Sequence, residues 1–114
     1  MNEINKQGLA PIHLAVLSES MEILGELVQL KEHIDINIRD SKYGYSALHY
    51  AAMCSKFTPM VNLLARSANI DVNVRSLNED TPLHMAVANK NYMSTICLVR
   101  QENNFFVYFL FIIY

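Results

Sequence analysis

The sequence lacks the features of several common classes of protein. Its 114 residues carry a formal net charge of −2, and its Lys and Arg residues form no cluster. Binding to DNA or RNA needs several clustered cations that neutralise phosphates, so we do not expect a nucleic-acid partner. Residues 1–6 contain no apolar run of the kind that a secretory signal needs. The length suits one compact domain or about three stacked repeats.

Cysteines and catalytic motifs are scarce or missing too. Cys54 and Cys97 lie in apolar segments without CxxC or Cys/His spacing, which excludes the usual disulfide and zinc frameworks. We therefore expect a reducing, intracellular location, with the cytoplasm first and the nucleus second. The sequence has no GxGxxG, P-loop or HExxH motif. We expect no enzyme activity, no cofactor, no metal and no small-molecule substrate.

What the sequence does contain is a motif that occurs three times. The copies are residues 10–16 (APIHLAV), 46–52 (SALHYAA) and 81–87 (TPLHMAV). Their histidines, 36 and 35 residues apart, are His13, His49 and His84. A period of 20 to 50 residues indicates an array of stacked supersecondary units.

A second motif recurs at a constant distance from the first. Asp35 and Asp71 each follow a motif histidine by 22 residues, and each precedes an asparagine by two residues, Asn37 or Asn73. The constant distance between the two motifs argues against a chance recurrence. The repeat therefore decides the predicted fold.

Each copy of the first motif predicts the start of a helix. Pro11 and Pro82 suit the first helical position, where the missing N–H would be unpaired anyway. Ser46 and Thr81 stand where a hydroxyl caps the first turn. Ala10 has no such hydroxyl, which costs about 1 kcal/mol, so we predict that the first repeat frays.

A polar turn and a second helix follow each motif helix. In the first unit the turn is 18–20, and the second helix carries an apolar stripe at a period near 3.6. The stripe consists of Ile23, Leu24, Leu27, Val28 and Leu30. The second unit has a first helix at 48–53, a turn at 54–59 with Thr58 as a cap, and a second helix at 60–64. The third unit has a first helix at 81–88, a turn at 89–91 and a second helix through 96–99.

Polar segments at 38–45 and 74–80 lie between the units, and we expect them to project as turns or short hairpins. The interval from Asp35 to His49 is one residue longer than the interval from Asp71 to His84, so we place one extra residue in 38–45. The sequence thus predicts an all-α solenoid of about three stacked helix-turn-helix units with short hairpin loops. The domain is 1–104, with units at about 5–39, 40–75 and 76–104.

Residues 105–114 (FFVYFLFIIY) break the pattern, because Phe106 stands where the period expects an aspartate. As a helix these ten residues would span about 15 Å, half of a bilayer's hydrocarbon core, so we do not expect a membrane span. Two interpretations stay open. In the first, the array is truncated or the tail is aberrant. In the second, the tail is a hydrophobic end cap or docking segment.

The repeated motif and the Asp-x-Asn motif resemble those of the ankyrin-repeat family, whose signature is Thr-Pro-Leu-His-x-Ala. The resemblance covers about residues 5–104 and implies hairpins and antiparallel helix pairs stacked with the inner helices on the concave side. Ala10 departs from the family's threonine, and Glu79 stands where Gly8 and Gly44 stand in the other units. Three residues occupy the usual glycine position between the helices: Glu19, Ser55 and Lys90. These departures affect local turn geometry.

Within that family the chain is similar to the arrays of NF-kappa-B inhibitors and NF-kappa-B precursor proteins, in residues 8–16, 40–51 with the extra hairpin residue, and 71–84. This resemblance implies a non-catalytic module that clasps a Rel-type transcription factor and masks its nuclear localisation and DNA-binding surfaces. The alternative is a scaffold or substrate-recruiting adaptor with an unrelated protein partner.

The motif histidines invite a metal or catalytic interpretation, but successive units stack roughly 10 Å apart, too far for shared metal bonds near 2 Å. We expect His13, His49 and His84 to hydrogen-bond a turn and tie adjacent units. His33 is alone in a loop, where we expect it to be solvated.

Without a metal or catalytic site, the candidate functional site is a surface. Inner-helix positions at i, i+3 and i+4 share one face. There we predict partner contacts at Leu14, Leu17, Tyr50, Met53, Met85 and Asn89, with packing between helices as the alternative for Leu14, Leu17 and Met85. On the projecting loops we predict contacts at Arg39, Tyr43, Tyr45, Arg75 and Leu77, with solvated loops as the alternative.

Overall fold

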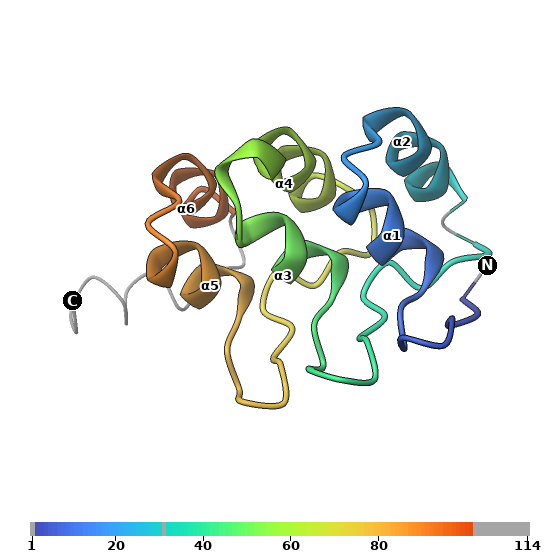
Figure 1. The fold of residues 1–114 in the computed structure, drawn as a ribbon. Coiled ribbons are helices and arrows are strands. Elements are labelled where there is room, and N and C mark those ends of the chain that lie inside the picture. Colours follow the sequence, from blue (N-terminus) through green and yellow to red (C-terminus); the bar gives the residue numbers. More distant parts are fainter. Residues whose placement is uncertain (1, 31, 102–114) are drawn as a thin grey trace.

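A computed structural model describes residues 2–30 and 32–101 of the chain. The helices are α1 Pro11–Leu17, α2 Met21–Gln29, α3 Ala47–Ala52, η1 Ser55–Phe57, α4 Thr58–Ala65, α5 Pro82–Ala88 and α6 Tyr92–Val99. They form three antiparallel pairs side by side: unit one (α1 and α2), unit two (α3 and α4) and unit three (α5 and α6) (Figure 1). The described residues contain no strand. The prediction of an all-α array of three stacked units is confirmed.

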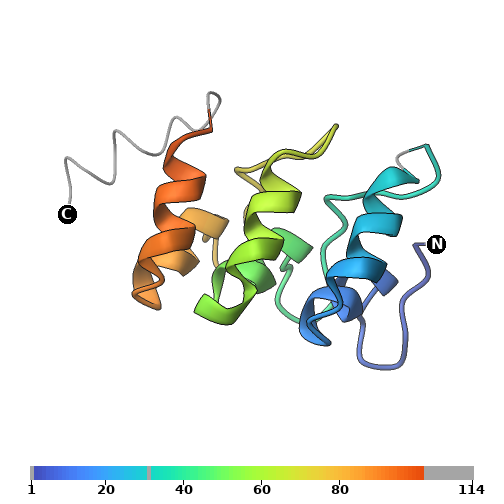
Figure 2. The same ribbon diagram turned by 90° about the horizontal axis from the view of Figure 1, so that it is seen from above.

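The helices lie in two layers. The inner helices α1, α3 and α5 form one row, and the outer helices α2, α4 and α6 form a second row above it (Figures 1 and 2). Each inner helix packs on its own outer helix, and α3 packs on both α1 and α5. The core between the layers contains fully buried aliphatic side chains from all three units, among them Ile12, Val16, Leu24, Leu48, Leu64, Leu83 and Leu98. No unit could bury its own apolar face alone, so stacking supplies the core.

Side-chain caps set the starts of the inner helices. Ser46 Oγ accepts the N–H of His49, and Thr81 Oγ1 accepts the N–H of His84. Ala10 has no such oxygen, yet α1 still begins at Pro11. The predicted fraying of unit one concerns motion and stays a prediction.

Three details differ from the sequence-based expectations. Thr58 does not cap α4: the N-cap residue is Phe57, and the Thr58 hydroxyl instead donates to the Ser55 carbonyl at 2.8 Å. Ile23 does not pack with the rest of its stripe, since it is 52% exposed. Helix α4 begins at Thr58, inside the predicted turn 54–59, and Pro59 lies in its first turn, where proline suits a helix start.

The turns between helices show why the glycine positions of the repeat can change. Glu19 and Lys90 adopt positive φ angles of 60° and 55°, so they take the left-handed conformation that glycine adopts freely. Ser55 does not, because unit two makes its turn with the short helix η1. Glu79 also has a positive φ, like Gly8 and Gly44 at the same place in the other units.

Three loops project below the inner helices (Figure 1). We call them finger one (residues 5–9), finger two (40–45) and finger three (76–80). A backbone hydrogen bond closes finger two between residues five apart, Asp40 and Tyr45, whereas finger three closes between residues four apart, Ser76 and Asp80. The extra residue predicted in 38–45 therefore lies in finger two.

Residues 105–114, and the last three residues predicted for unit three, lie outside the described residues. Across the described ranges, no helix is both long enough and apolar enough to span a bilayer.

Candidate protein-binding surface

The inner helices α1, α3 and α5 and the three fingers lie along one side of the molecule (Figure 1), and we call the exposed side chains of these elements the concave surface. On α1, Leu14 and Leu17 are 40% and 41% exposed. Tyr50, Met53 and Met85 are half-buried at the corresponding positions of the other units. Large apolar side chains that stay open to solvent mark a surface available for contact.

A side-chain oxygen at the first residue holds each finger in shape. Asn5 Oδ1 accepts the N–H groups of Gln7 and Leu9, and Ser76 Oγ accepts those of Asn78 and Asp80. Such local acceptors stabilise turns because they satisfy backbone donors that no helix or sheet pairs.

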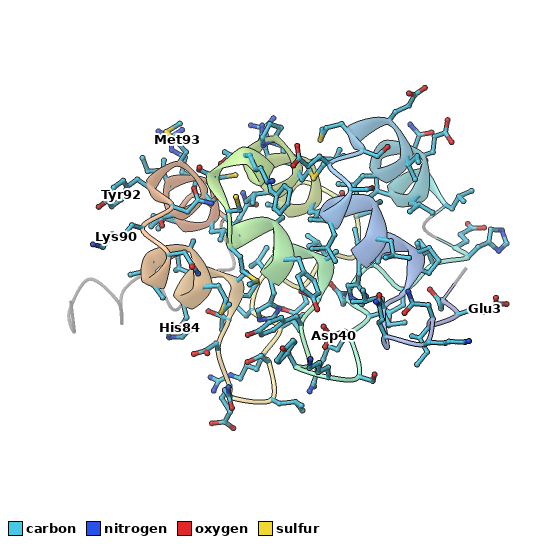
Figure 3. All side chains as sticks on the ribbon, in the orientation of Figure 1. Glu3, Asp40, His84, Lys90, Tyr92 and Met93 are labelled. Atoms are coloured by element: carbon cyan, nitrogen blue, oxygen red, sulfur yellow. The ribbon has the colours of Figure 1, made fainter. Side chains whose placement is uncertain are left out.

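Asp40 plays this part in finger two, where Figure 3 shows it below α3. Its Oδ1 accepts three backbone N–H groups, from Tyr43 and Gly44 at 2.8 Å and from Tyr45 at 3.3 Å. The Tyr50 hydroxyl donates to its Oδ2. Burial alone would raise the pKa of the Asp40 carboxyl, but these hydrogen bonds together outweigh burial and lower the pKa. Asp40 is therefore an ionised acceptor that holds the finger closed.

Neighbouring fingers are joined to one another. The N–H of Ser41 in finger two donates to the carbonyl of Gly8 in finger one at 3.2 Å, and the N–H of Leu77 in finger three donates to the carbonyl of Tyr43 at 2.9 Å. A Cβ at Gly44 would come within 2.8 Å of the Leu77 nitrogen. The fingers thus form a connected row.

Aromatic rings fill the space between finger two and α3. Tyr43 stacks on Tyr45 with centroids 5.1 Å apart, and Tyr45 stacks on His49 at 5.5 Å. Tyr50 meets Tyr45 and His13 edge-on. Burial and the bond to Asp40 raise the pKa of Tyr50, so its hydroxyl stays protonated and donating. Tyr50 is therefore built into the support of finger two, and only part of its ring faces solvent.

The motif histidines join a helix start to a neighbouring segment. In each unit the ring Nδ1 accepts a backbone N–H, from Ala10, Ser46 or Thr81. Since Nδ1 accepts, the hydrogen of the neutral ring is on Nε2. His13 Nε2 donates to the Ile38 carbonyl at 2.9 Å, and His49 Nε2 donates to the Asp80 carbonyl at 2.7 Å.

These histidines are placed for structure. His13 and His49 are fully buried, and burial lowers the pKa of each ring more than its hydrogen bond to a carbonyl raises it. No group of three or more metal-ligating side chains occurs among the described residues.

The Asp-x-Asn motifs form a second set of links, on the loops that follow the outer helices. Asp35 Oδ1 accepts the N–H of Asn37 at 2.9 Å, and Asp71 Oδ1 accepts the N–H of Asn73 at the same distance. The Asn37 amide bridges to the next unit, where it donates to the Asn69 carbonyl and accepts the N–H of Asp71. Each Asp therefore closes its own turn, and Asn37 couples two units.

The remaining predicted contact residues differ in how far their side chains are exposed. Tyr43 and Leu77 are 46% and 61% exposed on their fingers, and Arg39 and Arg75 are exposed beside them. Tyr45 is half-buried under Tyr43. Asn89 is exposed, and its amide donates to the Met85 carbonyl.

Four supporting residues were not predicted from the sequence. Asn5 and Ser76 each lie eight residues before a motif histidine, and Asp40 lies nine before. Asn2 lies 35 residues before Asn37 and accepts the N–H of Asp35, as Asn37 does for Asp71. These fixed offsets from the repeat were the signal that would have identified them.

Comparisons with known proteins agree with the repeat geometry. Residues 1–76 match the family model "Ankyrin repeats (3 copies)". Over 82 residues, 72% of the chain, the sequence is 32% identical to the nuclear factor NF-kappa-B p105 subunit of Gallus gallus and covers 8% of that protein. Over 87 residues, 76% of the chain, it is 36% identical to alpha-latrotoxin-Lhe1a of Latrodectus hesperus and covers 6% of that protein. With alpha-latrotoxin-Lh1a of Latrodectus hasselti the identity is 34% over the same length, again 6% of the relative. The chain thus spans less than a tenth of the length of these relatives.

Proposed function

The chain belongs to the ankyrin-repeat family, whose arrays are protein–protein interaction modules, and we propose that it binds and retains a Rel-type transcription factor through its concave surface. The observation that carries the proposal is the exposure of Leu14, Leu17, Tyr43 and Leu77 along the inner helices and fingers. The similarity to the NF-kappa-B p105 subunit, together with the extra residue in finger two, favours a partner of this class.

The chemistry of the surface suits a protein partner. Leu14 and Leu17 offer apolar area on α1, and Tyr43 offers a rigid ring on finger two. Arg39 and Arg75 are exposed directly before fingers two and three, where a planar guanidinium can pair with a carboxylate of the partner. Aromatic and arginine side chains near the centre of an interface supply much of its binding energy.

The proposed mechanism is occlusion. The inner helices contact one side of the factor and the fingers reach around it, so that its nuclear localisation and DNA-binding surfaces are covered. The module has no catalytic step in this proposal. Its proposed location is the cytoplasm, with the nucleus as the alternative.

A scaffold or adaptor with an unrelated protein partner is the second candidate. The observation that favours it is the similarity to two alpha-latrotoxins at 34% and 36% identity, slightly above the 32% identity to the p105 subunit. Stacking constraints alone produce similarity of this size among repeats, so a partner has to be identified by binding.

A binding measurement with purified Rel homology domain tests the proposal. The full chain should bind the immobilised domain at micromolar concentration, and the pair of substitutions Leu14→Ser and Leu77→Ser should weaken binding at least about tenfold. Ile23→Ser, on an exposed side chain of the outer helix α2, is the matched control and should leave binding unchanged. Circular dichroism verifies folding of each variant. A folded chain that does not bind at this concentration would exclude the Rel-type partner and favour the scaffold.

A further inference from the structure

Helix α6, the last outer helix among the described residues, exposes three large apolar side chains, Tyr92, Met93 and Ile96. Tyr92 is 71% exposed and Ile96 is 45% exposed. Ile96 borders a hollow that Thr58, Pro59 and Asn62 of α4 also line, but the hydrogen-bonding and fully buried contacts of α6 come from other residues. Ser94 Oγ lies 3.3 Å from Thr58 Oγ1, the Asn91 amide donates to the Ala52 carbonyl, and Leu98 is fully buried.

The helix period places Tyr92 and Ile96 opposite these contacts. Ser94 and Leu98 are four residues apart and share one face of α6, and so do Tyr92 and Ile96. The two pairs are offset by two residues, or about 200° around the helix at roughly 100° per residue. Figure 3 shows Tyr92 at the end of the stack, directed away from unit two. We call Tyr92 and Ile96 the end face.

The repeat identifies what normally covers this face. Helices α4 and α6 each have eight residues, so their first and fifth positions correspond. In α4 these positions are Thr58 and Asn62, and both contact α6: Thr58 lies against Ser94, and Asn62 Oδ1 is 3.7 Å from Cys97 Sγ. The end face is therefore the surface on which a following segment would pack. Here it carries a tyrosine and an isoleucine instead of two polar residues.

An exposed apolar face marks a surface that packs against another segment or molecule. The end face is of this kind, since Tyr92 and Ile96 are both exposed. Residues 105–114 offer apolar surface: all ten are apolar or aromatic and none is charged. We propose that residues 105–114 cover the end face formed by Tyr92 and Ile96.

The connection is long enough. Ile96 and Gln101 are five residues apart, about 7.5 Å along a helix. The four steps from Gln101 to Phe105 can span up to about 14 Å. The number of residues between Gln101 and Phe105 is therefore sufficient for the proposed cover.

A tethered segment also outcompetes a second copy of the chain for the same face. A tether of a few residues gives a segment an effective concentration in the millimolar range. A second molecule at micromolar concentration competes at a disadvantage of about a thousandfold, given equal contacts. The favoured occupant is therefore the chain's own segment.

Photo-crosslinking in the full chain tests the proposal without disturbing the segment. With Tyr92→p-benzoylphenylalanine, irradiation should give a product of monomer mass whose crosslinked peptide lies within residues 105–114. The same substitution at Ile23, on the outer helix of unit one, is the matched control and should give no such peptide. A product of dimer mass would overturn the proposal in favour of a second copy, and a crosslink to any other segment would overturn it as well.

Hydrogen exchange supplies an independent test. Deletion of residues 105–114 should make the α6 amides exchange at least about tenfold faster, because local opening of that helix becomes easier. In a chain with Tyr92→Thr and Ile96→Asn, which restore residues of the type found in α4, the deletion should have little further effect. Equal effects of the deletion in both backgrounds, or no effect in either, would contradict the proposal. If the shortened chain does not fold, the crosslinking result decides.

Discussion

His49 Nε2 donates a hydrogen bond to the carbonyl of Asp80, 2.7 Å away and 31 residues further along the chain. His13 makes the corresponding bond to the Ile38 carbonyl at 2.9 Å. In both cases Nδ1 of the same ring accepts a backbone N–H at the start of its own helix. Each ring therefore has to be neutral, with its hydrogen on Nε2, to join the inner helix to the segment that leads into the next unit.

The first prediction concerns the stability that His49 provides. His49→Ala should lower the free energy of unfolding by about 2 to 4 kcal/mol, because it opens a cavity and leaves buried backbone groups unpaired. Urea denaturation followed by circular dichroism measures the loss. The control is His33→Ala, at an exposed loop position, which should change the free energy by less than about 0.5 kcal/mol. Equal effects at the two positions would show that the hydrogen bond from His49 to Asp80 does not contribute to the free energy of unfolding.

The second prediction concerns pH. Burial lowers the pKa of His13 and His49 in the folded chain, whereas both rings have a pKa near 6.5 when unfolded. The unfolded chain therefore binds more protons below this pH, and the free energy of unfolding falls as pH decreases. The slope should be at most about 1.4 kcal/mol per histidine for each pH unit, and stability should level off above about pH 7. Urea denaturation between about pH 8 and pH 5.5 measures this slope. A stability that rises on acidification would contradict the tautomer assignment.

The third prediction concerns Tyr50 and Asp40. Tyr50→Phe removes the hydroxyl that donates to the Asp40 carboxylate and should cost about 1 to 3 kcal/mol, as hydrogen bonds to charged groups do. The amides of Tyr43, Gly44 and Tyr45, which donate to the same carboxylate, should also exchange faster with solvent. Tyr43→Phe, on an exposed ring of the same finger, is the matched control. If both variants have the same stability as the parent chain, Tyr50 does not support finger two.

The fourth prediction concerns the strained turn of finger three. Glu79 has φ +65°, at the place where Gly8 and Gly44 stand in the other fingers. Glu79→Gly should raise the free energy of unfolding by about 0.5 to 1 kcal/mol, because relief of the left-handed conformation outweighs the added freedom of the unfolded chain. Asn78→Gly is the control: it also adds freedom to the unfolded chain, but it relieves no left-handed conformation. It should therefore not raise the free energy of unfolding. A destabilising Glu79→Gly would mean that the glutamate side chain makes a compensating contact.

Much of the fold could be predicted because the repeat fixes equivalent positions. The spacing of His13, His49 and His84 set the number of units, and Ser46 and Thr81 marked two helix starts. The longer interval before His49 located the extra residue of finger two. All these features depend on local chemistry or on periodicity, and a single sequence contains both.

The errors arose where a neighbouring element decides the outcome. Periodicity placed Ile23 on an apolar stripe. Burial also needs a neighbouring unit that covers the stripe, and among the described residues no unit precedes unit one. Thr58 looked like a cap, but η1 places its hydroxyl near the Ser55 carbonyl. Tyr50 stays a predicted partner contact, but its bond to Asp40 was not predicted, because it depends on the path of finger two, which the sequence alone does not define.

The candidate surface was predictable as a set of helix and loop positions, because i, i+3 and i+4 spacing selects one face of a helix. Exposure then separates Leu14, Leu17, Tyr43 and Leu77 from the half-buried Tyr45 and Tyr50. The identity of the partner depends on the complementary surface of another molecule, so it has to come from a binding experiment.

Chemical-shift mapping tests the central claim most directly, that the concave surface binds a Rel-type factor. When unlabelled Rel homology domain is added to the isotope-labelled chain, the largest amide shifts should occur at Leu14, Leu17, Tyr43 and Leu77. The outer face of α2 should show no comparable change. Shifts confined to the outer helices, or a spectrum that does not change at a saturating concentration of the domain, would contradict the account.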